Sequence, residues 1–200
     1  MAFMARPRAP DYDSRRDVIL QRAAQLFAKF GYVATSIAMI ARACDMPKAL
    51  LYHYYPDKEA LLFDLLSLHL AALVAAVEGA AGSGEARLNA MSNALIDTYR
   101  SAYAPYQVQI ASLRRLAPER QEALRGLERR LVDLFADALV EARPRLAGHP
   151  LLKPVTMSLI GMLSWHYLWY RDGKELSPAD YARLATALLL NGVETALALR

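Results

Sequence analysis

Side chains suited to binding a nucleic acid gather between residues 36 and 59, in the stretch SIAMIARACDMPKALLYHYYPDKE. Lys48 can donate hydrogen bonds to the acceptors of guanine in a major groove. Tyr52 and Lys58 carry donors of the kind that hold phosphates and fix register rather than sequence. The chemistry that this stretch indicates is recognition of DNA, with no covalent bond made or broken.

Two short helices are needed to position these side chains. Apolar residues recur at helical spacing from Ser36 to Cys44, which predicts the first of them. Asp45, a residue type that visits the left-handed conformation at modest cost, interrupts it. Pro47 is favourable at the first position of the next helix, and Pro56 ends that helix. This is the layout of a helix-turn-helix, and its polar outer face carries Lys48, Ala49, Tyr52 and His53.

The residues around this motif supply further caps and contacts. Thr35 and Ser36 open the first short helix with exposed N–H groups and hydroxyls, a natural phosphate contact. We expect Ser14 to cap an earlier helix that ends at Gly31. Residues 1–13 form a basic arm whose arginines can reach phosphates, although a solvated tail is an equal alternative.

From Ser14 to Leu66 the chain resembles the TetR family of bacterial transcriptional regulators, through LFAKFGYVATS and IARACDMPKALLYHYYPDKEALL. The family usually has glycine where Asp45 stands and more polar residues at positions 47, 49 and 50, so the base-reading surface here is less polar. For His53, packing beside the next tyrosine is the alternative to a DNA contact. The resemblance implies phosphate contacts from Thr35, Tyr52, His53 and Lys58, and base contacts from Pro47, Lys48 and Ala49.

The pattern predicts an all-α chain of about nine helices, with no strand. We expect a helix-turn-helix domain over residues 14–60 and a ligand-binding and dimerisation domain over 61–200. The segment 154–170 is apolar on almost every face, so it must be covered on all sides. A capping box at Ser177 opens a ninth helix. Pairing of these last two helices with their copies gives a homodimer, whose recognition helices enter major grooves about 34 Å apart.

The resemblance also implies an effector cavity in the second domain. The stretch GMLSWHYLWYRDGKELSP is similar to that of a TetR branch that regulates fatty-acid, steroid-ring and phenylacetate degradation, many members of which respond to acyl-CoA thioesters. Arginines between residues 114 and 130 suit the phosphates of such a ligand, although a charged, solvated helix face is the favoured explanation of them. A filled core is the alternative reading of the expected ligand contacts, which are Met91, Tyr99, Tyr103, Tyr106, Leu113, Arg114, Met162, Trp165 and His166.

Composition narrows the class of protein. The 200 residues are 55% hydrophobic with a net charge of +4, and residues 1–60 hold nine Lys/Arg against six Asp/Glu. That basic excess fits phosphate binding, although it is small. Cys44, the single cysteine, indicates a buried structural thiol in a reducing cytoplasm. The start of the chain has too little apolar length for a signal peptide, and the most apolar later run, residues 155–170, is short for a membrane span.

Catalysis is not expected. The four histidines are scattered, and no paired carboxylates or Cys/His cluster has catalytic or metal-ligand spacing, so we expect no enzyme, metal site or cofactor. The sequence favours a cytoplasmic repressor that binds a palindromic double-stranded DNA operator as a homodimer and is released by a small molecule. A regulator controlled by a protein partner and an activator are the alternatives.

Overall fold

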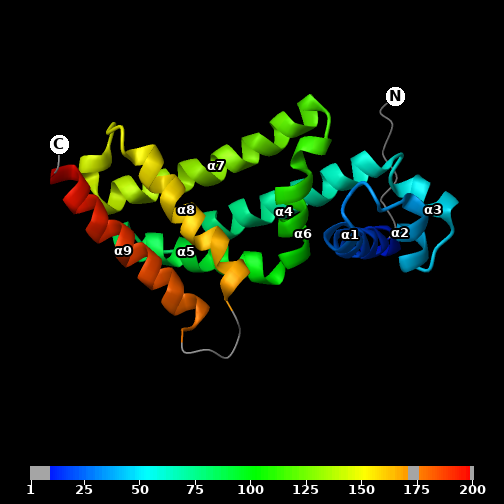
Figure 1. Cartoon of the computed structure of the whole chain (residues 1–200), viewed down its shortest axis with the longest axis horizontal. Helices are drawn as coiled ribbons and strands as arrows, with labels where there is room; N and C mark the ends of the chain where they lie inside the picture. Colours follow the sequence, from blue (N-terminus) through cyan, green and yellow to red (C-terminus); the bar gives the residue numbers. More distant parts are fainter. Residues whose placement is uncertain (1–9, 171–175, 199–200) are drawn as a thin grey trace, which may run out of the picture. The chain divides into compact units, whose positions relative to one another are not determined.

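The computed structural model describes residues 10–170 and 176–198, and in these ranges it contains α-helices and short 3-10 segments but no strand. The prediction of an all-α fold with nine helices is confirmed for this part of the chain (Figure 1). The elements are α1 (Pro10–Phe30), α2 (Ile37–Ala43), α3 (Lys48–Tyr54), α4 (Lys58–Glu78), α5 (Gly84–Ser101), α6 (Tyr103–Ser112), η1 (Leu113–Arg115), α7 (Pro118–Ala142), η2 (Pro144–Leu146), α8 (Leu152–Trp169) and α9 (Pro178–Ala198).

The chain divides into two compact units, which are described separately. The first unit contains the described residues up to Ser67 together with Ala104–Gln121. The second contains Leu68–Tyr103 and the described residues from Glu122 onward. This division differs from the expected boundary at residue 60 because the α6–η1 segment groups with the helix-turn-helix.

The core of the first unit is built from one apolar stripe on each helix. Ile19 and Ala23 of α1 are fully buried, as are Ile40 of α2 and Leu51 of α3. Helix α2 contacts both α1 and α3, so α1 supports the pair of helices that form the corner. The burial of one apolar residue per turn is what the helical periodicity predicted.

Helix α1 begins earlier than expected. It starts at Pro10, so Ser14 lies inside the helix and does not cap it, and residues 10–13 are helical and not part of an extended arm. Proline is favourable in a first turn because its missing N–H has no helical partner there. Residues 1–9 of the expected arm lie outside the described residues.

The ends of the short helices follow local sequence rules. Gly31, with φ of 80°, ends α1, and its N–H donates to the carbonyl of Phe27 at 2.9 Å. Asp45 has φ of 50°, which confirms the predicted left-handed corner. Pro47 is the N-cap of α3, one position before the expected one. Asp57 Oδ1 accepts the N–H of Ala60 at 2.6 Å and so caps α4 as predicted.

In the second unit α5 packs against both α8 and α9, which also pack against each other (Figure 1). Leu88, Met91 and Leu95 form the buried face of α5. The predicted capping box is present, because the Ser177 hydroxyl donates to Asp180 Oδ2 at 2.5 Å and accepts the N–H of Asp180 at 3.1 Å. Local capping therefore fixes where the last helix begins.

The starts of two helices differ slightly from expectation. Helix α6 begins at Tyr103, not Pro105, and α8 begins at Leu152, not residue 154.

Helix α4 is long and apolar enough to cross a membrane by length and composition alone. Six of its seven leucines are nonetheless buried within the chain, whereas Leu68 is exposed; the buried ones are Leu61, Leu62, Leu65, Leu66, Leu70 and Leu73.

Candidate nucleic-acid interface

The outward face of α3 carries the residues expected to read DNA. Pro47, Lys48 and Ala49 at its start are exposed, and so are Tyr52 and His53 one turn later. Lys48 Nζ lies 5.5 Å from the centroid of the Tyr52 ring, a cation–π contact along the exposed face. The sequence therefore placed these five side chains on one accessible surface of a short helix.

The two neighbouring tyrosines pack inward and hold α3 in place. Tyr54 stacks on Tyr12 of α1, with ring centroids 4.6 Å apart, and Tyr55 is buried. His53 makes an edge contact with Tyr54 at 6.1 Å while remaining exposed. His53 can therefore pack against Tyr54 and still be accessible to DNA.

At the start of α2 the structure separates two residues that were expected to act alike. Ser36 is exposed and is the N-cap, where its Oγ accepts the N–H of Met39 at 3.2 Å. Thr35 is buried, and its hydroxyl donates toward the carbonyl oxygens of Gly31 at 2.9 Å and Leu26 at 3.2 Å. The expectation that Thr35 offers an exposed hydroxyl to phosphate is wrong, because the end of α1 uses that hydroxyl.

Lys58 has a structural role that the sequence did not reveal. Its Nζ donates to the carbonyl oxygens of Tyr32 and Thr35, both at 2.8 Å, and lies 4.3 Å from the centroid of the Tyr32 ring. Partial burial lowers the pKa of its ammonium. A phosphate contact from Lys58 would have to break this clamp on the loop between α1 and α2, so the geometry favours the clamp.

The half-buried carboxylate of Asp64 positions the recognition helix. Asp64 of α4 accepts from Arg16 of α1 through the Nε–Nη2 edge of the guanidinium group, with Nη2 2.6 Å from Oδ1 and Nε 3.0 Å from Oδ2. Tyr55, at the C-cap of α3, donates its hydroxyl to the same carboxylate at 2.5 Å. Burial, followed by the hydrogen bond to Asp64, raises the pKa of Tyr55, so the phenol stays protonated. Three helices thus meet at one carboxylate.

A second polar contact ties the first turn of α4 to the segment before α7. Glu59 Oε1 accepts the N–H of Ala117 at 2.9 Å and lies 3.2 Å from Arg120 Nη1. The Arg120 guanidinium also covers the Phe63 ring at 5.6 Å. Sequence reasoning missed this contact and the pairing of Arg16 with Asp64 because these partners are 48 to 61 residues apart and obey no local spacing rule.

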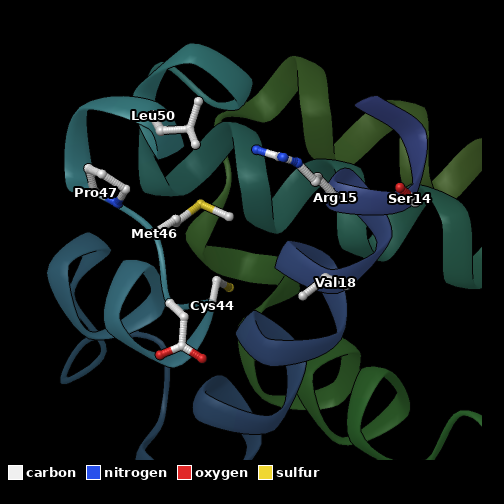
Figure 2. A pocket seen from close by; sticks show the side chains of 8 residues that line it. Ser14, Arg15, Val18, Cys44, Met46, Pro47 and Leu50 are labelled. Carbon is white, nitrogen blue, oxygen red and sulfur yellow. The ribbon is translucent and has the colours of Figure 1, made fainter. Parts of the chain in front are cut away.

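A hollow of about 420 Å³ lies beside the corner of the helix-turn-helix. Figure 2 shows Arg15 and Val18 of α1 facing Met46, Pro47 and Leu50 across it. Cys44 also lines this hollow; it is half-buried and not fully buried as expected, and this burial raises the pKa of its thiol. A raised pKa disfavours the reactive thiolate, which supports the structural role predicted for this cysteine.

The residues expected to contact an effector are divided between the two units. Tyr106, Leu113 and Arg114 belong to the first unit, and the others belong to the second. Met91, Tyr99 and Tyr106 are buried, whereas Tyr103, Arg114 and Trp165 are exposed, and Met162 lines a hollow of about 370 Å³ between α8 and α9. The arginines expected near a phosphate are engaged in part with carboxylates, since Arg120 pairs with Glu59, Arg129 with Glu122 and Arg130 with Glu78.

The end of α8 forms an aromatic cluster. His166 is buried and stacks between Tyr170 at 4.4 Å and Tyr181 at 4.7 Å, while Trp169 makes an edge contact at 5.2 Å. Tyr181 of α9 donates its hydroxyl to the carbonyl oxygen of Met162 at 3.0 Å. Tyr181 was missed as a member of this cluster because the stripe of α9 alone indicates only a packing face.

The described residues contain no group of three or more His, Cys, Asp or Glu side chains arranged to hold a metal ion.

Two family models match the chain. The model of bacterial regulatory proteins of the tetR family matches residues 19–65, and the model of the tetracyclin repressor-like C-terminal domain matches residues 81–193. The chain belongs to the TetR family. It is therefore a DNA-binding transcriptional regulator and not an enzyme.

Solved TetR structures share the whole fold. A TetR-family regulator from Bordetella parapertussis is 34% identical, with a TM-score of 0.81 over 90% of this chain and 95% of that one. The structure of AibR in complex with isovaleryl coenzyme A and operator DNA is 26% identical, with a TM-score of 0.73 over 87% of this chain and 97% of that one.

Curated TetR-like relatives match to different extents. The transcriptional repressor KstR2 of Rhodococcus jostii is 27% identical over 90% of this chain and 91% of its own length. The uncharacterised regulator YuxN of Bacillus subtilis is 40% identical over 55 residues, which is 28% of this chain, and the chain spans only 19% of YuxN in that match. The match to YuxN is therefore a local one.

Proposed function

We propose that this TetR-family chain is a cytoplasmic repressor that binds a palindromic operator as a homodimer and is released by an acyl-CoA thioester. In this proposal residues 14–60 bind DNA, and residues 61–200 bind the effector and form the dimer. The observation that carries the DNA-binding part is the exposed face of α3, with Lys48, Ala49, Tyr52 and His53 accessible together.

The proposed DNA contacts follow from exposure and chemistry. Lys48 and Ala49, with Pro47, lie at the start of α3, where a recognition helix reaches base edges. Tyr52, His53 and Ser36 have donors on the exposed surface that suit phosphate oxygens. Thr35 and Lys58 hold the loop between α1 and α2 and act on DNA through it.

Uncovered apolar side chains on α8 and α9 support the homodimer. Trp165 and Leu188 are 61% and 60% exposed in the single chain, and Leu168 and Leu184 are also exposed. Leaving such side chains in water forgoes their burial free energy, so a partner surface is favoured. A second copy is the partner that a two-fold operator requires.

The effector proposal rests on relatives and on the aromatic character of the second unit. The solved structure of AibR contains isovaleryl coenzyme A together with operator DNA. KstR2 is a repressor. The expected contacts Tyr99, Met162 and His166 are apolar or aromatic side chains with a few polar atoms, a combination that suits an acyl chain. The ligand can shift the protein between DNA-binding and released states only by its differential affinity for them.

A titration tests the effector proposal. Acyl-CoA thioesters of increasing chain length are added to the protein bound to a fluorescent operator duplex, with the matching free acids and CoA as controls. Release of DNA by one thioester class, but not by its acid or by CoA, is the expected result. A thioester that binds by calorimetry without changing DNA affinity would overturn the release mechanism, and no binding by any thioester would favour a regulator controlled by a protein partner.

A further inference from the structure

A second hollow in the second unit lies between α7 and the start of α8. Its volume is about 780 Å³, within the usual range of small-molecule sites. Apart from Arg125 and Arg129, which belong to the arginines expected near an effector phosphate, it is lined by no residue expected to contact the effector. The hollow therefore needs an explanation that the proposed function does not give.

One wall of this hollow is apolar. Val132 and Ala136 of α7 face Leu152 and Met157 of α8. Met157 is 48% exposed, so its apolar side chain is accessible on this wall. Burying such a wall against an apolar ligand is favourable at about 25 cal/mol per Å².

The rim carries an excess of positive charge. Arg125, Arg129 and Lys153 line the hollow against Glu128 and Asp133. The first turn of α8 contains no acidic residue, so Lys153 adds to the positive end of the helix dipole and is not balanced within that turn. This rim is suited to an anion.

The ion pair that Arg129 already makes does not prevent such a contact. Arg129 Nη2 lies 2.7 Å from Glu122 Oε1, but the side chains are 60% and 59% exposed. Exposed pairs contribute at most about 1 kcal/mol, so Arg129 can exchange its partner at little cost.

A neutral donor completes the rim. His149 Nδ1 accepts the N–H of Leu151 at 3.1 Å. A neutral imidazole with an accepting Nδ1 carries its proton on Nε2, which is then a hydrogen-bond donor. His149 also lines the hollow.

We infer that the groove between α7 and α8 is a second ligand site, which binds a small amphipathic anion with an apolar chain or ring on the α7–α8 wall and one anionic group at the Arg129–Lys153 rim. A carboxylate and a phosphate ester share this chemistry. The site shares only Arg125 and Arg129 with the contacts expected for the effector, and none of the apolar and aromatic ones.

Calorimetric titration of the full-length chain with n-decyl phosphate tests the site, with decanoate and inorganic phosphate as further arms. Saturable binding of at least one decyl compound is expected, and headgroup preference separates a phosphate ester from a carboxylate. Binding of inorganic phosphate as tightly as decyl phosphate would overturn the apolar half of the proposal. Absence of saturable binding by either decyl compound would overturn the site.

Matched variants locate the bound ligand. Arg129→Gln combined with Lys153→Gln is expected to weaken decyl phosphate binding about tenfold or more, because each charged hydrogen bond adds to affinity. Arg130→Gln is the control: it removes the neighbouring α7 arginine, which pairs with Glu78 outside the groove and should change affinity less than about twofold. Equal affinity in the double variant and the parent would place the ligand elsewhere and overturn the inference. Thermal unfolding checks that both variants remain folded.

Discussion

Lys48 and Lys58 flank the recognition helix, yet the structure gives them different roles. Lys58 donates to two carbonyl oxygens of the α1–α2 loop, whereas Lys48 is exposed beside Tyr52. We predict that Lys58→Met lowers the free energy of unfolding by about 1 to 3 kcal/mol, because carbonyl groups lose a charged donor. Urea denaturation measures this change.

Lys48→Met is the matched variant for that measurement. It should change the free energy of unfolding by less than about 0.5 kcal/mol, as is usual at the surface, while weakening the binding of operator DNA. Equal stability of the Lys58→Met variant and the parent would contradict the structural role of Lys58.

His69 predicts a dependence of stability on pH. It is buried in α4 against Tyr99, and burial lowers its pKa to about 4. The unfolded chain binds a proton there below about pH 6.5, which the folded chain does only near pH 4. His69 therefore costs stability progressively as the pH falls through this window, by about 3 kcal/mol in total.

His69→Leu should remove that part of the pH dependence. The free energy of unfolding, measured by denaturant titration from pH 7.5 to pH 4, is expected to fall less steeply in the variant than in the parent. Parallel curves for the two proteins would show that His69 does not titrate in this way.

Which residues of α3 are exposed could be predicted from the sequence, but the hydrogen-bond partners of individual donors could not. Periodicity places Tyr52 and His53 outward because the inner stripe of the same helix is apolar. Thr35 and Lys58 are different, since their partners lie in the preceding loop and no local pattern shows a hydroxyl or ammonium turning toward it.

The corner between α2 and α3 depends on Asp45. Its φ of 50° is strained for a residue with a side chain and free of strain for glycine. We predict that Asp45→Gly raises the free energy of unfolding by up to about 1 kcal/mol, whereas Asp45→Ala lowers it by about 1 kcal/mol. Chemical denaturation of both variants decides this, and a more stable alanine variant would contradict the conformation of the corner.

The uncovered face of α8 and α9 predicts the assembly state. Leu188→Glu places a charge on that face, where Leu188 is 60% exposed in the single chain, and should convert the dimer into a monomer because burying an unpaired charge is costly. Sedimentation velocity measures the mass. Ile110→Glu, at an exposed apolar residue of α6, is the control and should remain dimeric. A dimeric Leu188→Glu variant would remove α9 from the interface.

Helix boundaries were predictable where capping chemistry is local. Gly31, Asp57 and Ser177 end or begin helices as their residue types predict. Helix α1 starts before Ser14 because Pro10 is itself a favourable first-turn residue, and serine is tolerated inside a helix. The grouping of residues 104–121 with the helix-turn-helix could not be predicted, since contacts such as Glu59 with Ala117 are distant in sequence.

Membership of the TetR family and the exposed face of α3 both indicate that the molecule binds DNA. A helix-turn-helix unit presents Lys48, Tyr52 and His53, and a larger helical unit carries the proposed effector and dimer surfaces. Regulation then requires two states of the dimer that differ in DNA affinity. Recognition of a specific duplex is the property on which every other part of this account depends.

Selection of duplexes from a random DNA library by the purified protein tests that property most directly. We expect enrichment of a palindromic sequence whose half-sites lie about one helical turn apart. The double variant Lys48→Ala, Tyr52→Ala should remain folded and lose that enrichment. Enrichment of no sequence by the parent protein, or the same enrichment by the variant, would contradict recognition of DNA through α3.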